Sequence, residues 1–255
     1  RLVGSEMCIR DSGDPDFFNG PGHAMRIVQS VAEMYSGVTY DITVKVEHIR
    51  KHKDLIPRLA ETGCLFVTTA VESFDDNVLE HLSKGHSRAD IIQAVNICRA
   101  VGMNISPTFV AFTPWTTPES YLDLLQQIVS LELVPHVAPI QLTIRLLVPL
   151  GSHILQTESF SPFLESYNDE SLSYGWRYEK SATVELEQKV KSIVANGISK
   201  SDSAAEIFSK LWDAAHQATG QIAPPLNNIS SPSSHSMSEP WYCCAEPSLD
   251  QFSNL

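Results

Sequence analysis

Between residues 40 and 148 the sequence alternates between two hydrophobic periods, and this alternation limits the possible folds more than any other feature. Apolar, β-branched runs long enough for one strand are separated by stretches with apolar residues at helical spacing. The four predicted strands are YDITVKVEHI (40–49), CLFVTTAVES (64–73), NISPTFVAF (104–112) and VAPIQLTIRLLVPLG (137–151). Nearly continuous apolar strands are typical of parallel sheets that are covered on both faces.

Signals for helix ends lie between these strands. Asp54 is the predicted N-cap of LIPRLAET, and Gly63 follows its end. Ser87 and Asp90 have the spacing of a capping box. Thr117 is the predicted start of a further helix. Each strand with its helix takes about thirty residues, as in a β/α barrel.

The predicted fold class is therefore α/β, a partial parallel (β/α) barrel with a helical C-terminal extension. The units are too few for a complete TIM barrel, and we expect the missing ones before Gly13. We interpret residues 1–12 as a non-native leader, with an ordinary ragged terminus as the alternative. Residues 13–152 form the predicted partial barrel, 153–222 the extension, with helices at 183–196 and 204–219, and 223–255 a Ser/Pro-rich linker and tail.

The charge balance excludes some functions. The net charge of -12 argues against a nucleic-acid or anionic-membrane surface, and no apolar run is long enough to span a bilayer. Five cysteines fit neither a disulfide framework nor a zinc site, which favours a reducing, cytoplasmic setting.

Ligands of β/α barrels bind at the C-terminal strand ends, so polar residues there are the candidates. In GDPDFFNGPG, Asp14 and Asp16 can accept hydrogen bonds from an ammonium group; the alternative is a turn whose aspartates cap a helix. Glu72 ends an apolar strand and needs a partner, which is either ribose hydroxyls of a ligand or a neighbouring Lys or Arg.

Two further segments carry weaker signals. In SKGHSR, Lys84 and Arg88 are able to hold a carboxylate, and solvated loop charges are the alternative. In QLTIRLLVP, the apolar run 147–149 suits packing against a flat ring, and barrel core is the alternative. His48 and His52 have a metal-ligand spacing, but their basic surroundings indicate a solvated face.

Together these segments resemble the radical S-adenosylmethionine (SAM) superfamily. The run AVESFDDNVLEHLSKGHSRADIIQAVNICRAVGMNISPTFVAFTPWTTPE (70–119) is similar to the middle section of that superfamily, and GDPDFFN resembles its element that meets the SAM amino group. The resemblance covers roughly residues 13–152 and implies a barrel that binds SAM and a [4Fe–4S] cluster. It also implies a 5′-deoxyadenosyl radical acting on an unknown substrate, with a reductant such as flavodoxin or ferredoxin.

The resemblance also assigns residues to SAM. It places Gly13, Asp14 and Asp16 near the ammonium group, Glu72 and Ser73 near the ribose, and Arg88 near the carboxylate. Thr108, Leu147 and Val148 would face adenine.

One departure from the superfamily concerns activity. Its cluster is held by a C-x-x-x-C-x-x-C loop, which this sequence lacks, so the resemblance implies a fragment that has lost the cluster ligands and is inactive by itself. The ending Cys243-Cys244-Ala245-Glu246-Pro247 resembles the tail of a CUAEP/CCAEP-type radical SAM family, which suggests a thiol or redox role for Cys243 and Cys244.

Two other functions remain open from the sequence. One is a non-catalytic nucleotide- or SAM-binding β/α module that never had a cluster. The other is a metal-dependent aldolase with a β/α barrel, which would need His or carboxylate ligands at several strand ends, whereas only Glu72 is clearly placed.

Overall fold

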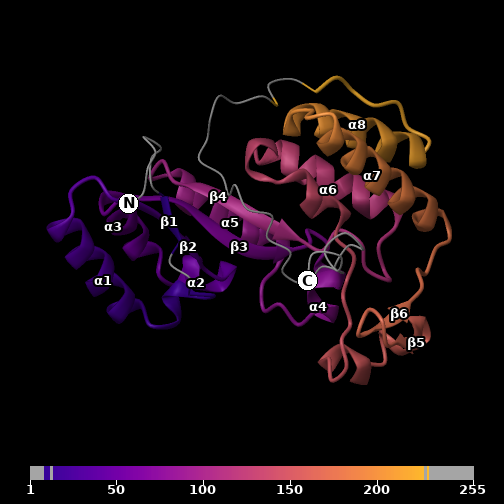
Figure 1. Cartoon of the computed structure of the whole chain (residues 1–255), viewed down its shortest axis with the longest axis horizontal. Helices are drawn as coiled ribbons and strands as arrows, with labels where there is room; N and C mark the ends of the chain where they lie inside the picture. The colour runs from indigo at the N-terminus through magenta and orange to yellow at the C-terminus, as the bar shows by residue number, and fades with distance from the viewer. Residues whose placement is uncertain (1–8, 12–13, 227–228, 230–255) are drawn as a thin grey trace. The chain divides into compact units, whose positions relative to one another are not determined.

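The computed structural model describes residues 9–11, 14–226 and 229, and within them the chain is α/β (Figure 1). The main sheet has four strands in the order β1-β2-β3-β4, and the first three pair in parallel. The strands are β1 (Ile9–Asp11), β2 (Thr39–Thr43), β3 (Cys64–Glu72) and β4 (Asn104–Phe109). The predicted α/β class with a parallel sheet is confirmed. β1 comes from the segment interpreted as a leader.

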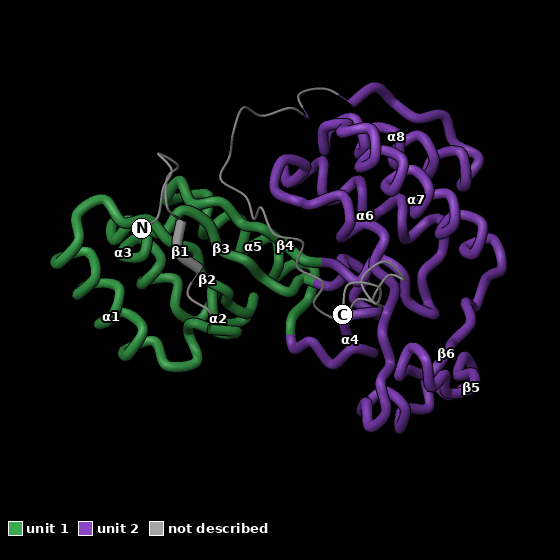
Figure 2. The backbone as a smooth tube through the Cα atoms, viewed as in Figure 1, with its two compact units in different colours: residues 1–71, 86–108, 233–236 green, residues 72–85, 109–232, 237–255 purple. Residues whose placement is uncertain are grey.

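The chain forms two compact units (Figure 2). Among the described residues, unit 1 holds the chain up to Val71 together with His86–Thr108. Unit 2 holds Glu72–Gly85 and the chain from Phe109 onward. The last residues of β3 and β4, Glu72 and Phe109, thus belong to unit 2.

Unit 1 combines the sheet with four helices. These are α1 (Pro21–Met34), α2 (Val46–Lys51), α3 (Ile56–Glu61) and α5 (Arg88–Arg99), with short 3-10 helices η1 (Phe17–Asn19) and η2 (Lys53–Leu55). Tyr40 shares a sheet face with Ile42 and bonds to Leu59 of α3, so this face lies under α3. The register pairs Ile42 with Val67 there, and both are completely buried. Asp41 and Thr68 point to the opposite face and are buried as well.

Two helix starts have the predicted chemistry. The Ser87 hydroxyl accepts from the Asp90 N–H, and Asp90 accepts from the Ser87 backbone, which is a full capping box for α5. Thr117 and Ser120 form a second box at α6 (Pro118–Ser130). After α5 the chain turns at Gly102 with φ 72, a left-handed conformation that glycine adopts without steric cost.

Three predicted elements were wrong in extent or type. The strand predicted at 40–49 ends at Thr43, and α2 begins at Val46, because Val46 and Ile49 at i, i+3 bury one helical face. Asp54 lies inside η2 and is not an N-cap. The strand predicted at 137–151 begins as η4 (Pro139–Thr143), since Pro139 lacks the N–H of a ladder residue.

Unit 2 contains α4 (Asp76–His81), α6, α7 (Ala182–Ser199), α8 (Ala204–Ala218) and the hairpin β5 (Leu164–Asn168) and β6 (Ser173–Trp176). Its 3-10 helices are η3 (Val134–His136), η4, η5 (His153–Gln156) and η6 (Ser161–Phe163). Both helices predicted for the extension, at 183–196 and 204–219, are confirmed as α7 and α8.

The mixed sequence ESLSYGWRYE (170–179) predicts irregular structure, and β6 of the hairpin, which lies within it, corrects that prediction. Tyr167 and Tyr174 pack edge to face across the strands, with 5.0 Å between ring centroids. The Asn168 side chain accepts from the Glu170 and Ser171 N–H groups and closes the turn. Among the residues described, no helix combines the length and apolarity needed to cross a membrane.

Candidate functional site

Three parallel segments of unit 2 end side by side. The Val110 N–H donates to the Glu72 carbonyl at 2.9 Å, which joins the end of β3 to the continuation of β4. The Phe112 N–H donates to Ile144 at 2.9 Å, and the Leu146 N–H to Phe112 at 2.8 Å. The carboxyl ends of parallel strands are where β/α folds bind ligands, so this edge is the candidate site.

Glu72 is a charged side chain at the end of β3 on this edge. It is only 6% exposed, and its φ of 67 is a left-handed conformation in a residue with a Cβ. Such a conformation costs on the order of 1–3 kcal/mol and is often retained for function. Glu72 Oε1 accepts from Lys84 Nζ at 2.7 Å. The structure thus contains the ion pair that was the structural alternative for Glu72.

The neighbouring residue Ser73 is engaged locally. Its hydroxyl accepts from the Asp75 N–H at 3.0 Å, and the Asp75 carboxylate accepts from the Asn77 N–H as the N-cap of α4. Ser73 therefore stabilises the turn from β3 to α4. It is the residue that directly follows Glu72 in the chain.

The side chains of the predicted adenine-facing run differ in how deeply they are buried. The Val148 side chain is completely buried, whereas Leu147 is partly exposed. The Val148 carbonyl accepts from the Tyr174 N–H at 2.8 Å, and the Leu146 carbonyl accepts from Trp176 Nε1 at 2.8 Å. Of this pair, Leu147 offers apolar side-chain surface, whereas the Val148 side chain belongs to the core.

The remaining described candidates belong to unit 1. Asp14 Oδ1 accepts from the Asp16 N–H at 2.9 Å. Asp16 is buried, with Oδ1 3.0 Å from His48 Nδ1 and Oδ2 3.5 Å from Lys45 Nζ. Its carboxylate therefore has cationic or hydrogen-bonding partners within the protein. The solvated face predicted for His48 was wrong, because its side chain is 16% exposed and pairs with Asp16.

Thr108 is buried in β4, and Arg88 is the first residue of α5. These two, with Asp14 and Asp16, lie in a different unit from Glu72, Ser73, Leu147 and Val148. Gly13, Cys243 and Cys244 lie outside the described residues. Of the predicted site residues, Glu72 and Ser73 therefore lie at the carboxyl edge of the parallel segments in unit 2. The segment that contains Leu147 and Val148 ends at the same edge.

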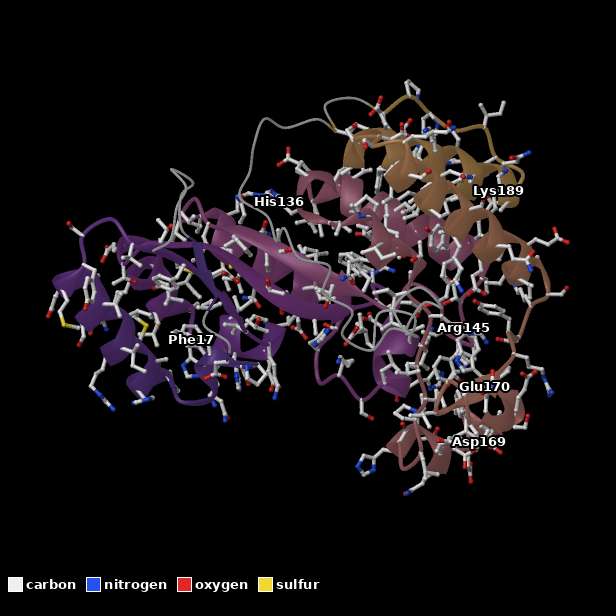
Figure 3. All side chains as sticks on the ribbon, in the orientation of Figure 1. Phe17, His136, Arg145, Asp169, Glu170 and Lys189 are labelled. Atoms are coloured by element: carbon white, nitrogen blue, oxygen red, sulfur yellow. The ribbon has the colours of Figure 1, made fainter. Side chains whose placement is uncertain are left out.

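A partly buried charge cluster surrounds Arg145, which Figure 3 labels. Arg145 is a charge within the predicted strand 137–151, and its partners were missed by sequence reasoning. The Arg145 guanidinium stacks on the Trp176 ring at 3.7 Å, and its Nη1 lies 3.7 Å from Glu187 Oε2. Glu187 also accepts from the Tyr178 hydroxyl at 2.7 Å and pairs with Lys191 at 2.7 Å. The signals in the sequence were a charge within an apolar strand and aromatic residues 31 and 33 positions after it. The cluster fastens α7 to the segment of Arg145.

The described cysteines are unsuited to metal binding. Burial raises the pKa of the Cys98 thiol to about 12, and burial, together with nearby Cys98 and Asp41, raises the pKa of Cys64 still further. Both side chains therefore remain protonated thiols near neutral pH. In the part of the chain that the structure describes, no three His, Cys, Asp or Glu side chains form a group able to hold a metal ion.

Among the solved structures similar to this chain are three of the cobalamin-dependent S-adenosylmethionine radical enzyme OxsB. With aqua-cobalamin bound, the TM-score is 0.60 at 11% identity over 74% of this chain and 34% of that one. With aqua-cobalamin and S-adenosylmethionine bound, it is 0.60 at 12% identity over the same shares. For apo OxsB it is 0.57 at 11% identity over 82% and 39%.

At these identities the likeness defines the fold, which is one seen in a radical SAM enzyme. The matched part spans about a third of the length of OxsB. No protein-family profile matches the chain, and no curated protein matches its sequence.

Proposed function

We propose that this chain is the SAM-binding part of a radical SAM enzyme and that Glu72 receives the ribose of SAM. The observation that carries the proposal concerns Glu72, whose side chain is buried and whose backbone has a left-handed φ. This residue lies where parallel strands end, which is where β/α folds bind ligands. The fold shared with OxsB supports it. A carboxylate at this place accepts hydrogen bonds from vicinal hydroxyls, which a ribose provides.

The other roles follow from the residue types. Ser73 is positioned next to Glu72 to meet the ribose, and Leu147 offers an apolar surface to the adenine ring. Val148 is assigned to adenine as well. For residues of unit 1, the sequence predicts that Thr108 meets adenine, Asp14 and Asp16 the ammonium group, and Arg88 the carboxylate of SAM. The Asp16 contacts to Lys45 and His48 would have to exchange for such a ligand.

The described residues include no set of side chains suited to hold a [4Fe–4S] cluster. The buried thiols of Cys64 and Cys98 do not fit a [4Fe–4S] cluster, so the proposed work of the described residues is to bind and orient SAM. The same observation favours a second candidate, a SAM-binding module without a cluster. The two differ in whether the full-length protein cleaves SAM.

The test is SAM affinity, measured by isothermal titration calorimetry on the full chain. Glu72→Gln removes a charged acceptor, which is worth ~1.5–3 kcal/mol, or roughly ten- to hundredfold in Kd. Glu119→Gln is the matched control, because Glu119 is an exposed carboxylate of the same unit that pairs with Lys180 at 3.6 Å. Equal affinity of Glu72→Gln and the wild type would remove the ribose assignment.

A further inference from the structure

The loop between α4 and α5 folds back on the end of β3. α4 ends in a Schellman motif, in which the Lys84 N–H donates to Leu79 at 3.0 Å and the Ser83 N–H to Glu80 at 2.9 Å. Ser83 has the left-handed φ of 52 that this motif requires. The motif reverses the chain at Lys84 and so determines where this side chain starts.

The next residues fix the loop to the strand. His86 Nε2 lies 3.2 Å from the Val71 carbonyl, so it acts as the donor to the residue before Glu72. Ser87 then caps α5. The loop thus has a hydrogen-bonded anchor on each side of Lys84, and these anchors fix the backbone position from which the Lys84 side chain reaches Glu72.

Burial makes the two partners unequal. The Glu72 side chain is 7% exposed and the Lys84 side chain 28%. A carboxylate that is this deeply buried needs a cation or donors, whereas the half-exposed ammonium group can be hydrated. The lysine is therefore the partner that holds the carboxylate in place.

We infer that Lys84 is the positioning residue of the proposed nucleoside site: it holds Glu72 Oε1 and thereby orients the carboxylate toward ribose hydroxyls. This inference rests on the proposed function. It adds to the site a cation from the same unit as Glu72, whereas Arg88 belongs to the other unit. Without the ammonium group, Glu72 Oε1 would lose its partner and the carboxylate would rotate toward water, which removes the oriented acceptor.

The experiment measures adenosine binding, because adenosine carries the ribose and lacks the amino-acid part of SAM. We expect Lys84→Met to weaken adenosine binding by about tenfold, the effect of losing one charged hydrogen bond. Lys84→Arg keeps the charge and should bind within a fewfold of the wild type. Lys84→Met combined with Glu72→Gln should bind no more weakly than the weaker single variant, since both act through one carboxylate.

Lys180→Met is the matched control, because Lys180 forms the exposed pair with Glu119 in the same unit. Thermal melting of each variant separates binding from folding, and affinities are compared well below every Tm. One outcome would overturn the inference: Lys84→Met lowers the Tm but binds adenosine as tightly as the wild type, while Glu72→Gln binds adenosine more weakly. Lys84 would then have only a structural role. If Glu72→Gln also binds normally, or the wild type binds neither adenosine nor SAM, the proposed function itself fails.

Discussion

Two non-glycine residues near the candidate site adopt left-handed backbone conformations, and they do so for different reasons. Ser83 ends helix α4, at a position where most proteins place glycine. The Ser83 side chain has no role in the proposed site. Glu72 ends strand β3, and its left-handed backbone places a carboxylate at the proposed site.

Ser83→Gly should therefore stabilise the protein. Glycine removes the steric cost of the left-handed φ, and we expect a gain of about 0.5–1 kcal/mol in the free energy of unfolding, measured by urea denaturation. Ser201→Gly is the matched comparison, because Ser201 has φ 58 just after α7 and should give a similar gain. A loss of stability at both positions would contradict this account. SAM affinity should not change.

At the scale of elements, the close contact of α7 and α8 depends on one buried glycine. A Cβ at Gly197 would lie 2.5 Å from Ile207 Cγ1 and 2.8 Å from Cδ1. Replacing glycine in a helix by alanine gains about 1 kcal/mol in propensity. Overpacking a core costs about 1–3 kcal/mol. Because the first contact is to Cγ1 near the helix backbone, the second effect should win.

We expect Gly197→Ala to lower the free energy of unfolding by about 1–2 kcal/mol in urea denaturation. Ile207→Ala in the same chain removes the clashing atoms. The added cost of the alanine should then disappear when the double variant is compared with Ile207→Ala alone. An equal cost in both backgrounds would show that the helices do not meet as described.

The start of α5 makes part of the stability pH-dependent. Burial raises the pKa of Asp90, but hydrogen bonds from Ser87 and the charge of Arg50 outweigh it, so the net pKa lies below the usual range. A carboxyl whose folded pKa is depressed stabilises the fold above its unfolded pKa of about 3.9, and this contribution is lost as the pH falls through the folded pKa. Asp90→Asn should therefore destabilise the protein at pH 6 and matter less at pH 3. A difference that is equal at both pH values would contradict the link.

For the molecule as a whole, the proposed role in SAM binding without cluster ligands predicts that this chain does not cleave SAM by itself. After anaerobic iron–sulfur reconstitution, the 255-residue chain should form no 5′-deoxyadenosine from SAM above a no-protein control. The physical reason is that the sequence lacks the three closely spaced thiolates that hold one cluster. Product above the control would show that other residues complete a cluster. Retained SAM binding in the same sample would separate loss of chemistry from loss of fold.

Local patterns in the sequence determined the α/β class, the capping box at Ser87, the helix start at Thr117 and the helices of the extension. These depend on neighbours three or four residues apart, so a sequence reveals them. Tertiary structure alone decided that YDITVKVEHI divides into a strand and a helix and that residues 164–176 form a hairpin. It also decided that Lys84 pairs with Glu72 and Arg145 with Glu187, because a buried charge selects its partner by distance in space, and no period in the chain encodes that distance.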